Sequence, residues 1–64
     1  MPIIRVDWIE GRTLEQKRSL AAKITEVVCE CARTTPDRVT VIINDIPKTN
    51  HAKAGVLRAD EEAR

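Results

Sequence analysis

Aromatic residues are almost absent from this 64-residue chain, which has no Phe, no Tyr and a single Trp. Proteins that bind single-stranded nucleic acids stack bases on aromatic side chains, and nucleic-acid-binding domains usually carry a clustered basic face. Here eleven Lys and Arg residues are balanced by ten Asp and Glu residues, for a formal net charge of +1. We therefore expect no nucleic-acid partner.

Cysteine and histidine are also scarce. Cys29 and Cys31 are two residues apart in a stretch with helical periodicity, so their side chains point to nearly opposite sides, and His51 is the only histidine. This set suits neither a disulfide framework nor a metal site. We expect free thiols, no metal and no cofactor.

Long apolar segments are missing as well. No run approaches the ~20 apolar residues needed to cross a bilayer, and the N-terminus lacks a basic segment followed by a long apolar core. We expect a cytoplasmic protein with no membrane partner.

The chain is short, and short chains bury little surface. A domain of this size buries only about 60% of its unfolded surface and is marginally stable alone. Without disulfides or a metal, oligomerisation is the remaining source of stability. We expect one domain over residues 1–64 that works as a homo-oligomer.

The hydrophobic pattern predicts a strand followed by a helix. Residues 4–8 alternate between apolar and polar side chains, which is typical of a strand. Thr13 and Gln16 fit a helix capping box. The apolar residues that follow fall on one helical stripe, formed by Leu20, Ile24, Val27, Val28 and Cys31.

The second half predicts another strand and a small hairpin. Pro36 ends the helix because proline disfavours helical geometry in the residue before it. Residues 39–43 are rich in Val and Ile and form the second strand. Beyond Pro47 the pattern is less regular, with a short hairpin around Gly55 and a frayed polar end over residues 58–64.

This order predicts an α/β (α+β) fold built on one βαβ unit. A crossover of about 30 residues makes the two strands parallel and the connection right-handed. One helix covers only one face of the sheet, yet the second strand has apolar residues on both faces, Val41 and Ile43 on one and Ile42 on the other. Parallel sheets are normally buried on both sides, so we expect copies of the chain to cover the open face.

Pro2 is the most distinctive residue chemically. A small residue after Met1 usually allows the methionine to be removed, which would leave a secondary amine at the N-terminus. A free α-amino group titrates near pH ~8, close to the pH ~7 at which a general base works best. Considered alone, Pro2 is more simply explained as a strand start that needs no ladder donor.

Several segments together resemble the 4-oxalocrotonate tautomerase family, over the chain from Pro2 to about Leu57. They are Pro2-Ile3-Ile4, Glu10-Gly11-Arg12-Thr13, Glu15-Gln16-Lys17, the strand over residues 39–43 and Ala52-Lys53-Ala54-Gly55. The resemblance implies a βαβ protomer with a short C-terminal hairpin, whose sheet is completed by dimerisation. It also implies a homohexamer, most often a trimer of dimers, although the sequence leaves a trimer or dimer open.

The resemblance also implies residue roles. Pro2 would act as general base and acid, moving a proton between the 2-hydroxy oxygen and a distant carbon of an enol acid such as 2-hydroxymuconate. Arg12 would bind the substrate carboxylate through its guanidinium, and Ile9 would line the site. The simpler interpretations are a solvated turn arginine and a core isoleucine.

Two positions depart from the family pattern. Thr40 stands where well-known members carry a second arginine, which Arg38 or a neighbouring subunit's Arg5 or Arg33 could replace. His51 stands where an aromatic ring is common. A neutral His51 could bind substrate, a charged one would favour the neutral proline, and a surface loop position is the simpler alternative. These changes put a dicarboxylate substrate in doubt.

Two alternative functions stay open. Relatives of this kind also add water to unsaturated acids, remove halogen or decarboxylate, and the first two reactions need an extra carboxylate base. Asp7, Glu10 and Asp45 are candidates. The other alternative is a non-catalytic oligomeric module, because retention of Met1 would leave the Pro2 nitrogen as an amide with no basicity.

Overall fold

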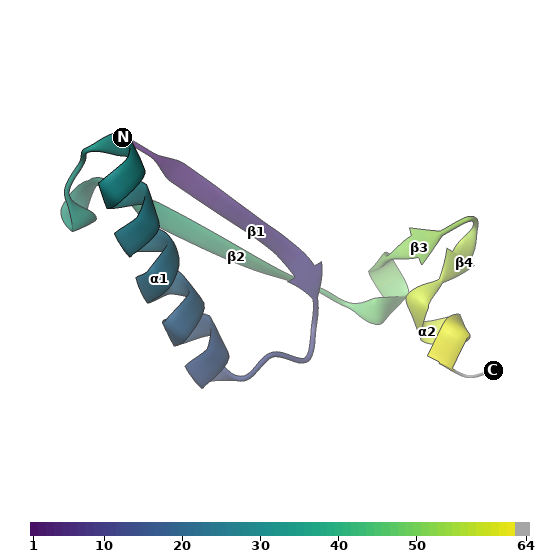
Figure 1. Cartoon of the computed structure of the whole chain (residues 1–64). Coiled ribbons are helices and arrows are strands. Elements are labelled where there is room, and N and C mark those ends of the chain that lie inside the picture. Colours follow the sequence, from purple (N-terminus) through teal and green to yellow (C-terminus); the bar gives the residue numbers. More distant parts are fainter. Residues whose placement is uncertain (63–64) are drawn as a thin grey trace.

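The computed structural model describes residues 1–62 and contains the βαβ unit that the sequence predicts. Strand β1 (Ile3–Ile9) leads into helix α1 (Leu14–Ala32), and a short 3-10 helix, η1 (Pro36–Arg38), precedes strand β2 (Thr40–Ile46). The two strands are parallel, with Ile3 opposite Thr40 and Ile9 opposite Ile46 (Figure 1). The α/β (α+β) class is confirmed.

Helix α1 begins and ends where its flanking residues dictate. The Thr13 hydroxyl accepts a hydrogen bond from the Gln16 N–H at 3.1 Å, and the Gln16 side-chain oxygen accepts one from the Thr13 N–H at 2.9 Å. This confirms the predicted capping box. At the other end Arg33 adopts a left-handed conformation with φ of 51°, and its N–H donates to the Cys29 carbonyl.

One face of the sheet packs against α1 and the other is open (Figure 1). Alternate residues of both strands are half-buried on the helix side, while Ile3 and Ile42 point the other way and are 64% and 45% exposed. No residue in the described part of the chain is fully buried. A single protomer therefore has no closed core.

The apolar stripe of α1 is only partly covered. Leu20, Ile24 and Val28 are half-buried, but Val27 is 56% exposed and Cys31 is exposed. The two-stranded sheet covers only the part of the predicted stripe that carries Leu20, Ile24 and Val28. Val27 and Cys31 are left uncovered by the protomer.

The C-terminal segment forms an arm that extends away from the βαβ unit (Figure 1). It passes through η2 (Lys48–Asn50) into an antiparallel hairpin of β3 (Ala52–Lys53) and β4 (Val56–Leu57), which confirms the predicted hairpin. Ala54 and Gly55 both have positive φ, as a tight two-residue hairpin turn requires. The molecule measures 46 × 24 × 13 Å.

The end of the arm differs from the frayed end expected from the sequence. Helix α2 (Arg58–Glu62) follows β4 directly. The Arg58 N–H donates to the His51 carbonyl at 2.8 Å, and the Arg58 side chain pairs with Glu61 one turn later at 3.6 Å. These contacts stabilise a polar turn that periodicity alone does not indicate, while residues 63–64 lie outside the described part. None of the helices formed by the described residues has the length and apolar character needed to span a bilayer.

Candidate active site

Pro2 lies at the N-terminal edge of the sheet, held by the first residue of β2. The Thr40 N–H donates to the Pro2 carbonyl at 3.0 Å. Pro2 is half-buried, whereas Met1 is 90% exposed. Arg38, which ends η1 two residues before Thr40, is exposed near the same edge. The structure thus brings together three of the predicted site residues at this end.

Ile9 and Arg12 lie at the opposite end of β1. Ile9 is the last residue of the strand, half-buried and opposite Ile46. Seven residue steps at the rise of an extended strand place it about 23 Å from Pro2. Pro2 and Arg12 of one protomer therefore do not meet, and the described residues of one protomer enclose no pocket.

The loop that carries Arg12 is fixed on both sides. Gly11 has φ of 123°, a conformation that residues with a Cβ rarely adopt. The Glu10 N–H donates to the Ile46 carbonyl at 2.9 Å, and the Glu10 carboxylate accepts from the Lys48 N–H at 3.1 Å. The capping box at Thr13 follows directly, so the backbone around Arg12 is tied to both β2 and α1.

The Arg12 guanidinium rests over the Trp8 ring, 5.3 Å from its centroid. It is exposed, and it makes no hydrogen bond or ion pair with any other residue that the structure describes. Arg5 and Arg18, in contrast, each pair with an acidic neighbour. Arg12 therefore keeps its N–H groups available for a carboxylate from outside the chain.

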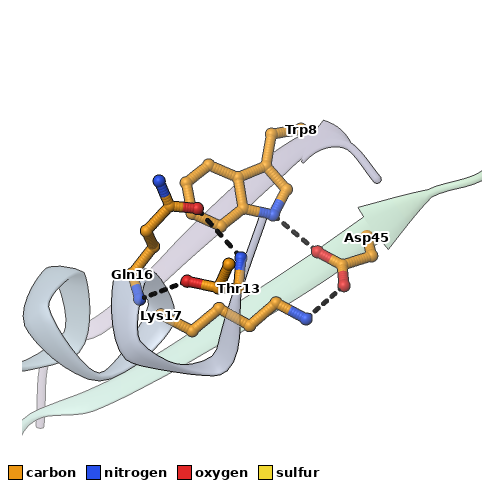
Figure 2. Close-up of polar contacts among 5 residues, drawn as sticks. All are labelled: Trp8, Thr13, Gln16, Lys17 and Asp45. Carbon is orange, nitrogen blue, oxygen red and sulfur yellow. Dashed lines mark hydrogen bonds and ion pairs between the residues drawn. The ribbon is translucent and has the colours of Figure 1, made fainter. Parts of the chain in front are cut away.

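The Trp8 ring is itself anchored by Asp45, a contact that sequence reasoning missed. The Trp8 Nε1–H donates to Asp45 Oδ1 at 2.6 Å, and Lys17 of α1 pairs with Asp45 Oδ2 (Figure 2). The Lys17 hydrogen bond, and next the Trp8 hydrogen bond, lower the pKa of Asp45. The sequence did hold a signal for this contact. Asp45 alternates with Val41 and Ile43, so it lies on the helix side of β2, where a half-buried carboxylate needs hydrogen-bond donors.

The other acidic candidates also have partners. On the open face of the sheet Asp7 accepts a hydrogen bond from the Asn44 amide at 3.0 Å and pairs with Arg5 at 3.4 Å. The Asn44 hydrogen bond is the main cause of its lowered pKa. No group of three His, Cys, Asp or Glu side chains within residues 1–62 is arranged to hold a metal ion.

His51 lies in the arm, beyond the end of β2. It joins η2 to β3 and is half-buried, with its carbonyl bonded to the Arg58 N–H. Its Nδ1 atom is buried and has no hydrogen-bond partner among the described residues. His51 and Pro2 therefore lie at opposite ends of the sheet. His51 lies beyond the end that carries Ile9 and Arg12.

Comparison with known proteins gives a consistent picture. The family model described as "Tautomerase enzyme" matches residues 2–61. A probable tautomerase from Streptococcus pneumoniae serotype 4 is 45% identical over 58 residues, covering 91% of this chain and 97% of the relative.

Solved structures agree with this match. A structure from work on the 4-oxalocrotonate tautomerase isozymes of Methylibium petroleiphilum is 40% identical, with a TM-score of 0.89 over 97% of each chain. A heterohexamer 4-oxalocrotonate tautomerase from Chloroflexus aurantiacus J-10-fl is 28% identical, with a TM-score of 0.85 over 94% of this chain and 97% of that one. The chain therefore belongs to the tautomerase family of enzymes and has the 4-oxalocrotonate tautomerase fold.

Proposed function

We propose that this protein is a tautomerase that moves a proton within 2-hydroxydienoates or related enol acids, using the amine of Pro2 after removal of Met1. The observation that carries the proposal is the N-terminal geometry. Met1 is 90% exposed, while Pro2 is half-buried and its carbonyl is held by the Thr40 N–H. Loss of one exposed residue would leave a secondary amine already fixed at the edge of the sheet.

The proton transfer follows from the chemistry of that amine. The neutral Pro2 nitrogen takes the proton from the 2-hydroxy group, which leaves a conjugated dienolate. The protonated nitrogen then returns the proton to a distant carbon and yields an unsaturated ketone. Arg12 binds the substrate carboxylate and stabilises the negative charge that develops along the conjugated chain.

The complete site is assembled between copies of the chain. About 23 Å separates Pro2 from Ile9 within one protomer, so Arg12 must come from a neighbouring copy. Exposed apolar residues on the open face, with Ile3 and Ile42 among them, support association through that face. We propose a homohexamer, as a trimer of dimers in which dimerisation completes the sheet, by analogy with the hexameric relative.

The remaining predicted site residues set the substrate preference. Thr40 supplies a hydroxyl where a second cation would bind another carboxylate, and Arg38 lies two residues away on η1. Ile9 and His51 line the Arg12 side of the assembled site. Because Nδ1 of His51 is buried within the protomer, contact with substrate would involve the rest of the imidazole ring. This set favours enol acids with one carboxylate over dicarboxylates.

Hydration, dehalogenation and decarboxylation receive no specific support. The first two need a free carboxylate to activate water or to act as an extra base. Asp7, Glu10 and Asp45 each accept hydrogen bonds from within the chain. We therefore retain proton transfer as the proposed reaction.

An assay with two enols tests the proposal. Intact-mass measurement first verifies that Met1 is absent, and ultraviolet absorbance then follows the ketonisation of 2-hydroxymuconate and of phenylenolpyruvate. We expect catalysis of at least one enol, with the monocarboxylate preferred. Rates equal to those in buffer for both enols, with a verified N-terminal proline, would overturn the proposed function.

A further inference from the structure

We propose that Trp8 is a positioning residue for Arg12, and that Asp45 and Lys17 hold the indole in the orientation this requires. The inference rests on the proposed function, in which Arg12 binds the substrate carboxylate. It assigns a role to the only aromatic residue of the chain and to an ion pair outside the proton-transfer chemistry.

The Trp8 ring has a fixed orientation. Trp8 belongs to β1, Asp45 to β2 and Lys17 to α1, so three elements meet at this contact (Figure 2). Rotating the indole would break its 2.6 Å hydrogen bond to Asp45 in a partly buried setting. This hydrogen bond therefore keeps the same face of the indole ring turned toward Arg12.

The Arg12 guanidinium lies over this face of the Trp8 ring. The guanidinium lies 5.3 Å from the ring centroid, within the range of a cation–π contact. A guanidinium held over an aromatic face spends none of its N–H groups on that contact in the way that an ion pair does. The contact thus restricts a long exposed side chain while leaving its carboxylate-binding edge free.

The negative charge of Asp45 is compensated by Lys17. A bare Asp45 carboxylate beside Trp8 would compete with substrate for the Arg12 guanidinium. Both Asp45 oxygens are engaged instead, one by the indole N–H and the other by the Lys17 ammonium. Lys17 therefore balances the charge of Asp45, and Arg12 remains without an acidic partner.

Trp8 also reports on the site, because it is the only fluorophore of the chain. Titration of the intact oligomer with cis,cis-muconate, which has the two carboxylates but no enol, should change Trp8 emission on binding. The Arg12→Ala variant should lose this response. Since the measurement needs neither turnover nor a change at Trp8, it is independent of the proposed reaction.

Steady-state kinetics tests the role directly. Trp8→Leu should raise KM for the enol substrate by about 2- to 5-fold, the size of an exposed cation–π contact, with kcat changed less than twofold. Trp8→Phe should recover part of the loss because it keeps an aromatic face. Glu15→Gln, an exposed change near the start of α1, is the matched control and should leave KM unaltered.

The decisive comparison places Trp8→Leu in the Arg12→Ala background. If Trp8 acts through Arg12, the second substitution should leave the already raised KM, or the muconate Kd, unchanged. An equal increase in both backgrounds, an unchanged KM in Trp8→Leu alone, or an emission response that survives Arg12→Ala would overturn the inference. Should no enol react, the muconate Kd values of the four proteins, measured by isothermal titration calorimetry because Trp8→Leu removes the only fluorophore, still decide it. Failure of the proposed function is thereby seen separately.

Discussion

The two ends of β1 are built in opposite ways. At the Arg12 end, Gly11 sets the turn, Glu10 bonds to β2 and to the Lys48 N–H, and the capping box of Thr13 starts α1. At the Pro2 end, the Thr40 N–H holds the Pro2 carbonyl and Met1 projects into solvent. In the proposed function, the Arg12 end, called here the braced end, would hold the carboxylate-binding cation in place. The Pro2 end, called here the open end, would leave Met1 accessible for removal.

The same difference explains why one protomer has no enclosed site. In the proposed function each end supplies one part of the chemistry, and the strand keeps the two parts about 23 Å apart. The proposal therefore requires a neighbouring copy to bring its braced end next to an open end. The exposed apolar side chains of the sheet and of α1 supply the surface for that association.

The largest expected effect comes from the open end. Pro2→Ala replaces the ring amine by a primary amine after Met1 removal, and we expect kcat for enol ketonisation to fall about 100-fold, at the low end of general acid–base contributions. The assay uses the preferred enol at saturating concentration. A variant that keeps more than half the kcat would show that the ring amine of Pro2 is not required for the proton transfer.

Changes at the braced end should act on binding. Arg12→Ala removes charge-assisted hydrogen bonds worth about 1.5–3 kcal/mol, so we expect kcat/KM to fall about 10- to 100-fold, mainly through KM. Arg12→Lys keeps the charge but loses the planar fork, and should recover only part of this. An unchanged KM in Arg12→Ala would show that Arg12 is a solvated turn residue.

The helix cap next to Arg12 should contribute to stability. Thr13→Ala removes the hydroxyl that accepts from the Gln16 N–H, and we expect the free energy of unfolding to fall by about 1 kcal/mol. Urea denaturation at constant protein concentration measures it. Thr35→Ala is the matched control, because Thr35 precedes η1 without a side-chain cap bond, and it should have little effect.

The smallest expected effect is on how the free energy of unfolding depends on pH in acid. The pKa of Asp45 and that of Asp7 are both lowered in the fold, by hydrogen bonds chiefly from Lys17 and from Asn44. A lowered carboxyl pKa adds stability that is complete at neutral pH. That stability is lost as the pH falls below about 4, through the ordinary aspartate range to the folded pKa.

Comparison of variants isolates this dependence. Asp45→Asn should flatten the decline of the urea midpoint between neutral pH and acid more than Glu15→Gln does, because Glu15 is exposed and shows no comparable set of donors. Identical acid profiles for Asp45→Asn and the wild type would indicate that the Lys17 and Trp8 contacts add nothing to folding.

Hydrophobic periodicity and local motifs in the sequence were enough to predict most of the fold. The alternation over residues 4–8, the Thr13 and Gln16 pair, and Gly55 predicted the strand, the helix start and the hairpin that the structure contains. Helix α2 was not predictable in this way, because its stability comes from the contact between the Arg58 N–H and the His51 carbonyl. That contact depends on how the hairpin folds back.

The candidate site was only partly predictable, for a geometric reason. Residue chemistry and the family resemblance single out Pro2 and Arg12, but only strand length places them at opposite ends of the sheet. The Trp8, Asp45 and Lys17 contact joins three elements that are distant in sequence. It depends on the register that sets Trp8 beside Asp45, which no local pattern specifies.

In the proposed function the Pro2 amine carries the proton, which requires Met1 to be removed. The most direct measurement compares two samples of the same chain, one processed and one retaining Met1, each verified by intact mass and by oligomeric state. We predict that the processed protein ketonises the enol and that the unprocessed protein does not exceed the buffer rate. Equal catalysis by both samples would contradict the account.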